Sequence, residues 1–294
     1  MNKYIAFLLM LSTANVFAQC KVTLSSKQNQ NRSITISYEK DTPGSCCVYI
    51  EFKNLSNANI PLKKYLIQNS RGTLLTLQPL DSKLSIFSSY SYKTVQGIPD
   101  PKVDSSFVYA LPFTPNTVVE ARDLKNFGST FLNREEPKNW RALQFIRSKP
   151  DTICAIRKGI VVEIIDKSAM DTTKNDIITS HHTTIKIEHE DGTFASYTGF
   201  DKDKIFAELG EEILPNQALG VLVQTNKEGT YQLRLTVIYL TEELTEDDKR
   251  RNRLVSMAYI NPFFQTSVGV VQLVEKTKYI TSISEDLIVK ELSK

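Results

Sequence analysis

The fold is decided by the stretch Lys186-Ile-Glu-His-Glu-Asp-Gly-Thr-Phe-Ala-Ser-Tyr-Thr-Gly-Phe200. It continues an alternation of apolar and polar residues that starts at residue 183, as on a half-buried β-strand, and then reaches the Asp191-Gly192 turn. Residues 160–165 are almost continuously apolar, and residues 231–239 alternate again. This half of the chain is therefore predicted to be mainly β.

The first half of the chain is also predicted to consist of strands. β-branched and aromatic residues recur in short segments separated by polar turns, and no convincing helix lies between them. These segments are residues 33–38, 47–52, 73–77 and 84–92. Such spacing favours a β-sandwich over residues 19–98. The turn-forming segment 97–106 is interpreted as a boundary, although one long hairpin loop within a single domain would also account for it.

The N-terminus is typical of a secretory signal peptide over residues 1–18. Lys3 precedes a short apolar run, and small residues end at Ala18. We therefore expect an exported protein, periplasmic or secreted, with no membrane span. Cys20 raises the alternative of a lipid-modified N-terminus, but Gln19 is a poor residue before such a cysteine, so cleavage after Ala18 without a lipid anchor is expected.

The four cysteines, Cys20, Cys46, Cys47 and Cys154, make a disulfide plausible in an exported chain. Cys46 and Cys47 would point to opposite faces of a strand, so only one of them is expected to pair with Cys20. The sequence does not decide the connectivity. Cys154 lies in an apolar strand segment, which indicates a buried residue in preference to a nucleophile.

Four segments resemble, in order, landmarks of the LytM/lysostaphin-like zinc endopeptidases, a family with the duplicated hybrid motif fold. They are residues 151–162, 185–193, 209–220 and 231–237. The first two resemble the family's hairpins. In the third, Asn216 stands where the family has a glycine, and Asn can occupy this position because it can adopt positive φ. The resemblance implies a small antiparallel β domain at 107–241. Residues 242–294 would form an extension whose terminal helix, capped by Ser284, is similar to that of exported Bacteroidetes-type members.

The residues expected to do zinc chemistry in that family are missing. Two histidines and an aspartate should hold the metal, and two more histidines should move protons. The resemblance places these roles on Trp140, Gln144, Gly199, Gln232 and Arg234. Gln is a poor zinc ligand, and a guanidinium repels a cation. We therefore expect a degenerate member with no catalytic residue, no metal and no cofactor, in which these positions line a candidate binding groove.

The three histidines do not rebuild a metal site in this interpretation. His189 occupies the position of a histidine that supports a hairpin in the family. His181 and His182 lie in a polar stretch and could bind a surface metal only adventitiously. No histidine precedes His181.

The leading hypothesis is an exported pseudoenzyme that binds peptidoglycan peptides or an envelope protein and regulates wall hydrolases. Two alternatives stay open: an active zinc endopeptidase that cleaves peptidoglycan cross-links with relocated ligands, and a structural or adhesive envelope protein. The chain has 36 basic and 33 acidic residues, and its basic run at 249–253 directly follows an acidic one. This balance does not favour nucleic acid as a partner.

Overall fold

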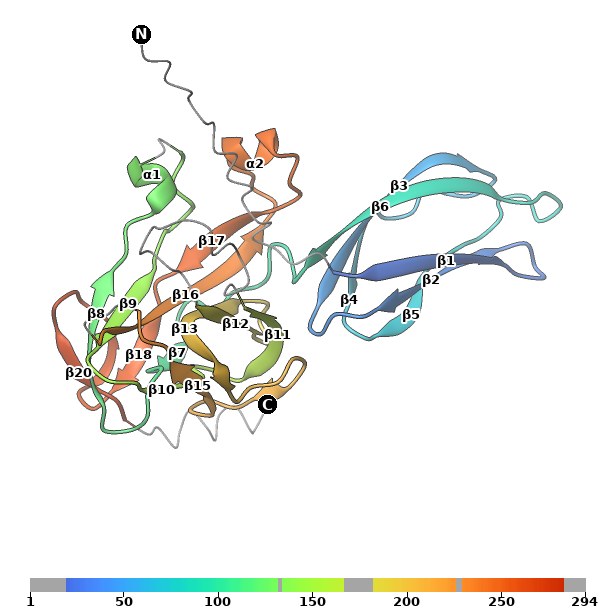
Figure 1. Cartoon of the computed structure of the whole chain (residues 1–294). Coiled ribbons are helices and arrows are strands. Elements are labelled where there is room, and N and C mark those ends of the chain that lie inside the picture. The colour runs from blue at the N-terminus through green and yellow to red at the C-terminus, as the bar shows by residue number, and fades with distance from the viewer. Residues whose placement is uncertain (1–19, 132–133, 167–181, 226–228, 283–294) are drawn as a thin grey trace, which may run out of the picture.

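The computed structural model describes residues 20–131, 134–166, 182–225 and 229–282. As predicted, they are mainly β, with two short helices. An N-terminal module extends to one side of a larger second module (Figure 1). Within the described ranges, no helix is long and apolar enough to cross a membrane. The predicted signal peptide and the predicted terminal helix lie outside these ranges.

The N-terminal module is a sandwich of two three-stranded antiparallel sheets. One sheet contains β1 (Val22–Gln28), β2 (Ile34–Lys40) and β5 (Arg71–Leu77), and the other contains β4 (Lys64–Ile67), β3 (Cys46–Ser56) and β6 (Phe87–Gln96). Ile36 and Leu75 from the first sheet share one core with Val48 and Ile50 from the second. Ile36 and Ile50 alternate with more exposed residues along β2 and β3, as on half-buried strands.

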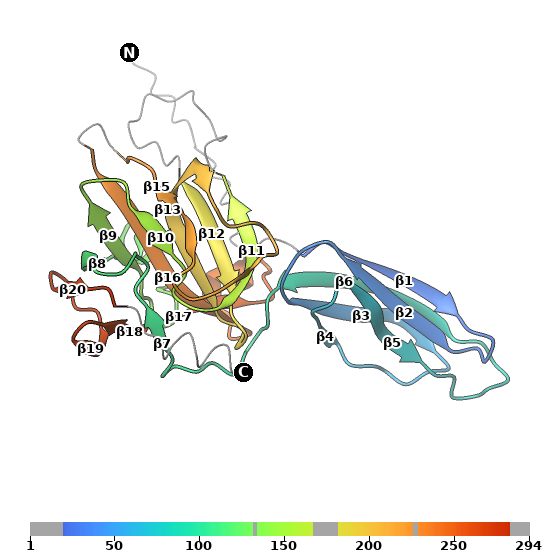
Figure 2. The ribbon, with the colours of Figure 1, turned by 90° about the horizontal axis from the view of Figure 1, so that it is seen from below.

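The second module is built on a large, mostly antiparallel sheet, whose strands lie side by side in Figure 2. In spatial order the main path contains β14 (Glu212–Ile213), β11 (Gly159–Ile165), β12 (Thr183–Glu188), β13 (Phe194–Ile205), β16 (Tyr231–Thr241), β9 (Leu143–Arg147), β8 (Val118–Asp123) and β20 (Lys278–Ile280). Beside this path, β17 (Ser256–Ile260) pairs with β16, and β10 (Thr152–Cys154) pairs with β15 (Ala218–Leu222).

The remaining elements are a small sheet and two helices. The sheet contains β7 (Val108–Ala110), β18 (Phe263–Thr266) and β19 (Gly269–Gln272), and the helices are α1 (Phe127–Phe131) and α2 (Glu246–Arg250). Asn216 adopts positive φ, as its place in the turn before β15 requires. The segment 151–162 differs from the hairpin that it resembles, because β10 pairs with β15 while β11 pairs with β12 and β14.

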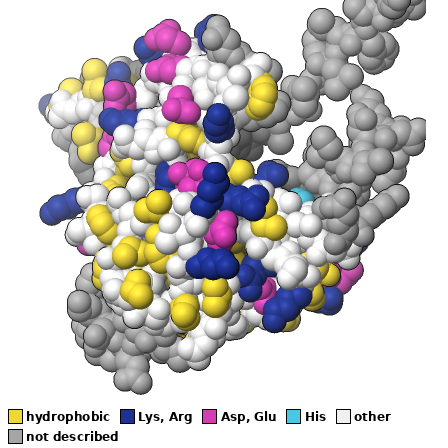
Figure 3. Space-filling view, turned by 90° about the vertical axis from the view of Figure 1, so that its left-hand side faces the viewer, with side chains coloured by type: hydrophobic (Ala, Val, Ile, Leu, Met, Phe, Trp, Pro, Cys, Tyr) yellow, Lys and Arg dark blue, Asp and Glu magenta, His cyan; other side chains and the backbone are white. Residues whose placement is uncertain are grey.

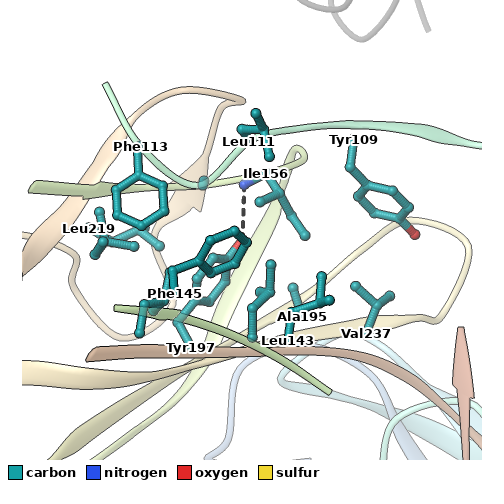
Figure 4. Packing of buried hydrophobic residues seen from close by; sticks show 14 of the residues in the cluster. Tyr109, Leu111, Phe113, Leu143, Phe145, Ile156, Ala195, Tyr197, Leu219 and Val237 are labelled. Atoms are coloured by element: carbon teal, nitrogen blue, oxygen red, sulfur yellow. Dashed lines mark hydrogen bonds between the residues drawn. The ribbon is translucent and has the colours of Figure 1, made fainter. Parts of the chain in front are cut away.

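Tyr197 lies at the centre of the second module's core. Its ring is fully buried together with those of Phe113 and Phe145. Its hydroxyl accepts a hydrogen bond of 2.9 Å from the backbone amide of Ile156, the dashed line in Figure 4. A buried tyrosine hydroxyl without a partner would be costly, so this bond allows an aromatic ring to fill the core without leaving a polar group unpaired.

The two modules meet at Glu188, whose side chain is only 7% exposed. Its carboxylate accepts hydrogen bonds from the backbone amide of Ser45, at 2.8 Å, and from the Ser45 hydroxyl. Gln96 adds a hydrogen bond of 3.1 Å from Nε2 to the carbonyl oxygen of Val162. Val95 packs beside Phe194 in a small apolar cluster. The N-terminal module is therefore held against one end of the main sheet's outer face.

Replacing Glu188 by alanine should lower the free energy of unfolding by about 2–4 kcal/mol, because Ser45 would keep two buried donors without an acceptor. Urea unfolding measures this change. The control is Glu212→Ala, which removes an ion pair to Lys158 in which the glutamate side chain is 62% exposed, so its cost should be below about 0.5 kcal/mol. Equal costs for the two variants would contradict a buried junction at Glu188.

Candidate functional site

A row of polar side chains crosses the outer face of the main sheet. It contains one residue from each of five adjacent strands, in the order Thr184, Thr198, Arg234, Gln144 and Arg122. Each residue lies directly opposite the next in the strand register. Side chains in such positions have Cβ atoms about 4.5–5.5 Å apart and interact with their neighbours. The Thr184 and Thr198 hydroxyls are 2.9 Å apart, within hydrogen-bond distance.

The alternation of β16 places two predicted site residues on this face. Leu233 and Leu235 are buried in the core. Gln232 and Arg234 lie between and beside them, so their side chains point to the opposite face of the sheet. Gln144 Nε2 donates a hydrogen bond of 2.7 Å to Gln232 Oε1. The structure therefore brings Gln144, Gln232 and Arg234 together.

Two guanidinium groups flank the pair of amides. Arg122 and Arg234 lie on either side of Gln144 in the register, and both are exposed. Neither forms an ion pair with a residue in the part of the chain that the structure describes, whereas Lys186 on the same face pairs with Glu163 at 2.5 Å. Guanidinium groups bind carboxylates through paired N–H donors. This part of the face can therefore receive an anionic group.

Gly199 joins the site through its backbone. Phe200 pairs with Thr183 and Thr198 with Thr184, so Gly199 is the extra residue of a β-bulge. Its φ of +140° lies where residues with side chains are rarely found, and a Cβ atom there would collide with the carbonyl oxygen of Gln232. The position at which the family resemblance expects a catalytic histidine has no room for a side chain.

Replacing Gly199 by alanine should lower the free energy of unfolding by more than about 3 kcal/mol, because either β13 or β16 must move. Thermal or urea unfolding tests this. Gly269→Ala is the matched control: its φ is +111°, but open space surrounds the added Cβ atom, so only backbone strain of about 1–2 kcal/mol is expected. If Gly199→Ala cost no more than the control, the close contact with Gln232 would be wrong.

Trp140 does not join the other four predicted positions. Its indole Nε1 donates to the carbonyl oxygen of Leu124 at 2.7 Å, and its ring packs on Tyr259 at a centroid distance of 4.6 Å. Tyr259 pairs with Ile238, four residues beyond Arg234 along β16, which corresponds to about 13 Å. Trp140 instead lines a separate open cleft of about 1070 Å³, together with Tyr239 and Phe263.

Gln144, Gln232 and Arg234 do not fit a zinc ion. Two neutral amides that hydrogen-bond to each other and a guanidinium supply neither the imidazole nor the carboxylate ligands that zinc needs. Within the described residues, no group of three His, Cys, Asp or Glu side chains could hold a metal. His182 precedes β12, and His181 lies outside the described residues.

His189 lies at the β12–β13 turn and supports it. Its Nδ1 is 2.7 Å from the carbonyl oxygen of Lys158, and since a carbonyl only accepts, Nδ1 carries the proton. The backbone amide of Gly192 donates to the carbonyl oxygen of His189 at 2.9 Å. The ring is 2% exposed, and burial, aided by the nearby Arg157 charge, lowers the pKa of His189 to about 4.

The buried ring predicts a loss of stability in acid. Because the folded pKa is lowered, the unfolded chain binds a proton first, so stability falls as pH drops from 6.5 to about 4. The loss attributable to His189 should be about 3 kcal/mol. His189→Gln keeps a donor for the Lys158 carbonyl but does not titrate, so the difference between the two proteins in urea-unfolding free energy should change by this amount over the range. Parallel pH profiles would contradict the assignment.

Basic and acidic side chains stand close together on the side of the molecule where β8 and β20 lie (Figure 3). Ion pairs join Arg141 to Asp123 and Arg147 to Asp151, each at 2.5 Å. The basic run 249–253, which begins in the last turn of α2, is paired in the same way, for example Arg253 with Asp248 at 2.8 Å. These charges are compensated, unlike those of Arg122 and Arg234.

No protein-family model matches the chain, and a comparison with curated proteins finds no match. Two solved structures are similar at low level. A chain from the SpoIIQ–SpoIIIAH pore-forming complex is 14% identical, with 44% of this chain and 84% of that chain covered and a TM-score of 0.29. A candidate M23 peptidase from Pseudomonas aeruginosa is 12% identical, with 75% and 87% covered and a TM-score of 0.29. These likenesses are too distant to assign a family or an activity.

Proposed function

We propose that the chain is an exported, noncatalytic relative of the LytM/lysostaphin-like endopeptidases that binds a carboxylate-bearing peptide on the outer face of its main sheet. The ligand would be a peptidoglycan stem peptide or a segment of an envelope protein. Arg122 and Arg234 would bind the carboxylate, and Gln144 and Gln232 would hydrogen-bond to the peptide backbone. Regulation of wall hydrolases would follow from this binding.

The observation that supports the proposal most is the hydrogen bond between Gln144 and Gln232. These two residues occupy the positions where the family resemblance expects a ligand aspartate and a histidine. Each amide still has donor or acceptor capacity after making this bond. The pair can therefore receive a peptide group while it lacks the charge that a zinc ion requires.

The two arginines give the proposal its chemical specificity. Arg122 and Arg234 are separated by one strand, so they lie about 10 Å apart at the backbone, on opposite sides of Gln144. Long side chains can bridge such a span, and both guanidinium groups lack ion-pair partners among the described residues. A ligand carboxylate above Gln144 would satisfy both charges.

A binding experiment tests the proposal. The purified mature protein should bind a synthetic stem peptide with a free C-terminal carboxylate, and Arg234→Ala or Arg122→Ala should each weaken binding about 10–100-fold, as expected for loss of a charge-assisted hydrogen bond. Calorimetry measures the affinity. The C-terminally amidated peptide should bind as weakly to the unaltered protein as the free acid binds to these variants.

Arg71→Ala is the matched control, because Arg71 is an exposed arginine on β5 of the N-terminal module. Its affinity should equal that of the unaltered protein. Loss of binding in the control would contradict the proposed site. So would an affinity that changes neither when the ligand is amidated nor when Arg234 is replaced by alanine. Stoichiometric zinc together with cleavage of purified peptidoglycan would establish the enzyme alternative in its place.

A further inference from the structure

We infer that Cys20 and Cys46 form a disulfide that ties the two sheets of the N-terminal sandwich together at the end facing the second module. Cys20 lies just before β1, and Cys46 is the first residue of β3. Their exposed fractions are 4% and 0%, and both belong to the same apolar core. The inference does not depend on the peptide-binding proposal.

Hydrogen bonds position Cys20 from two sides. Its carbonyl oxygen accepts from the Thr94 hydroxyl at 2.8 Å, which places its backbone over β6. Its thiol donates to the carbonyl oxygen of Ser45 at 3.9 Å, and Ser45 is bonded directly to Cys46. Cys46 shares the inward face of β3 with Val48, because residues two apart on a strand point the same way.

The two thiols also affect each other's ionisation. Hydrogen bonding between them lowers the pKa of Cys20 and raises the pKa of Cys46, and the Cys46 thiol donates to the carbonyl oxygen of Cys47 at 4.0 Å. Both residues are buried in the same core, and the Cys20 sulfur lies 3.9 Å from the carbonyl oxygen of Ser45, the residue bonded to Cys46. A disulfide requires cysteines that are neighbours in the fold, as these two are.

The other two cysteines do not offer this arrangement. Cys47 points to the opposite face of β3, where it adjoins Tyr49 and Lys64, and burial raises its pKa to about 11. Cys154 lies in the second module on β10, and burial alone raises its pKa to about 11. Neither residue lies in the core that holds Cys20 and Cys46.

The bond forms by thiol–disulfide exchange with a disulfide oxidant, such as oxidised glutathione or an oxidoreductase disulfide. The Cys20 thiolate attacks one sulfur of the oxidant, which forms a mixed disulfide and releases one thiolate. The Cys46 thiolate then attacks the Cys20 sulfur and releases the second thiolate. The two protons lost by the cysteines pass to the released thiolates, so two thiols are oxidised and one disulfide is reduced.

The disulfide would join two sheets that have no strand pairing with each other. The β1–β2–β5 and β4–β3–β6 sheets share no strand pairing, so only their side chains and connecting segments hold them together. Cys46 is also next to Ser45, which contacts Glu188 across the module junction. A bond at this point would therefore fix the part of the sandwich that carries the junction, and it would make Cys20 a structural residue, not a lipid attachment site.

Peptide mapping of the full chain, exported to an oxidising bacterial periplasm, tests the inference. Free thiols are alkylated under denaturing, non-reducing conditions before digestion and mass spectrometry. We expect a Cys20 peptide linked to the peptide that contains Cys46, with a mass lower by two hydrogen atoms than the sum of the reduced peptides. The link should persist in Cys47→Ser, which removes the adjacent alternative, and in Cys154→Ala.

Reduction should raise the unfolding equilibrium constant of the N-terminal module about 100-fold, and Cys20→Ala should make unfolding insensitive to reductant. Three results would overturn the inference: alkylation of both Cys20 and Cys46, a link from Cys20 that disappears in Cys47→Ser, or a lipid adduct on Cys20. Since alkylation and the lipid adduct are mapped on the unaltered protein, the first and the third result do not depend on whether the cysteine variants fold.

Discussion

The register of β16 is the constraint on which the second module depends. Leu233, Leu235 and Val237 are buried on one face, so the strand cannot shift by one residue without moving Arg234 into the core. The strand pairs with β13 on one side and with β9 and β17 on the other. The same register that buries the leucines thus decides which residues meet on the outer face. The alternation of apolar and polar residues along β16 therefore sets both the core packing and the geometry of the site.

The sequence predicts those parts of the site that follow from local alternation. Gln232 and Arg234 lie two residues apart on a strand that was predicted, and their shared face follows from that spacing. Arg122 could not be found in this way, because β8 carries no strong strand signal and reaches the site only through its pairing with β9. Trp140 lies away from the other predicted positions although it precedes Gln144 by only a few residues. Closeness in sequence does not determine how the chain bends before β9.

The mainly β architecture and the positive φ of Asn216 were predictable because each depends on a local pattern or on one residue's backbone preference. The junction between the modules was not. Glu188 belongs to an alternating segment and is equivalent in sequence to any exposed strand glutamate, yet it is hydrogen-bonded and buried at Ser45, which precedes β3 more than a hundred residues earlier in the chain. Long-range burial of a polar residue leaves no periodic signal in the chain.

Trp140 is the only tryptophan of the chain, and it lies in the cluster where Val95 and Tyr49 of the N-terminal module meet the second module. Its intrinsic fluorescence therefore reports on this junction and on the packing of Tyr259. The sandwich contains no tryptophan of its own, so its separate melting would reach the indole only through the loss of the contacts at the junction. A fluorescence trace and a circular dichroism trace of the same unfolding reaction would then follow different parts of the molecule, and any offset between them would measure how far the two modules unfold as one unit.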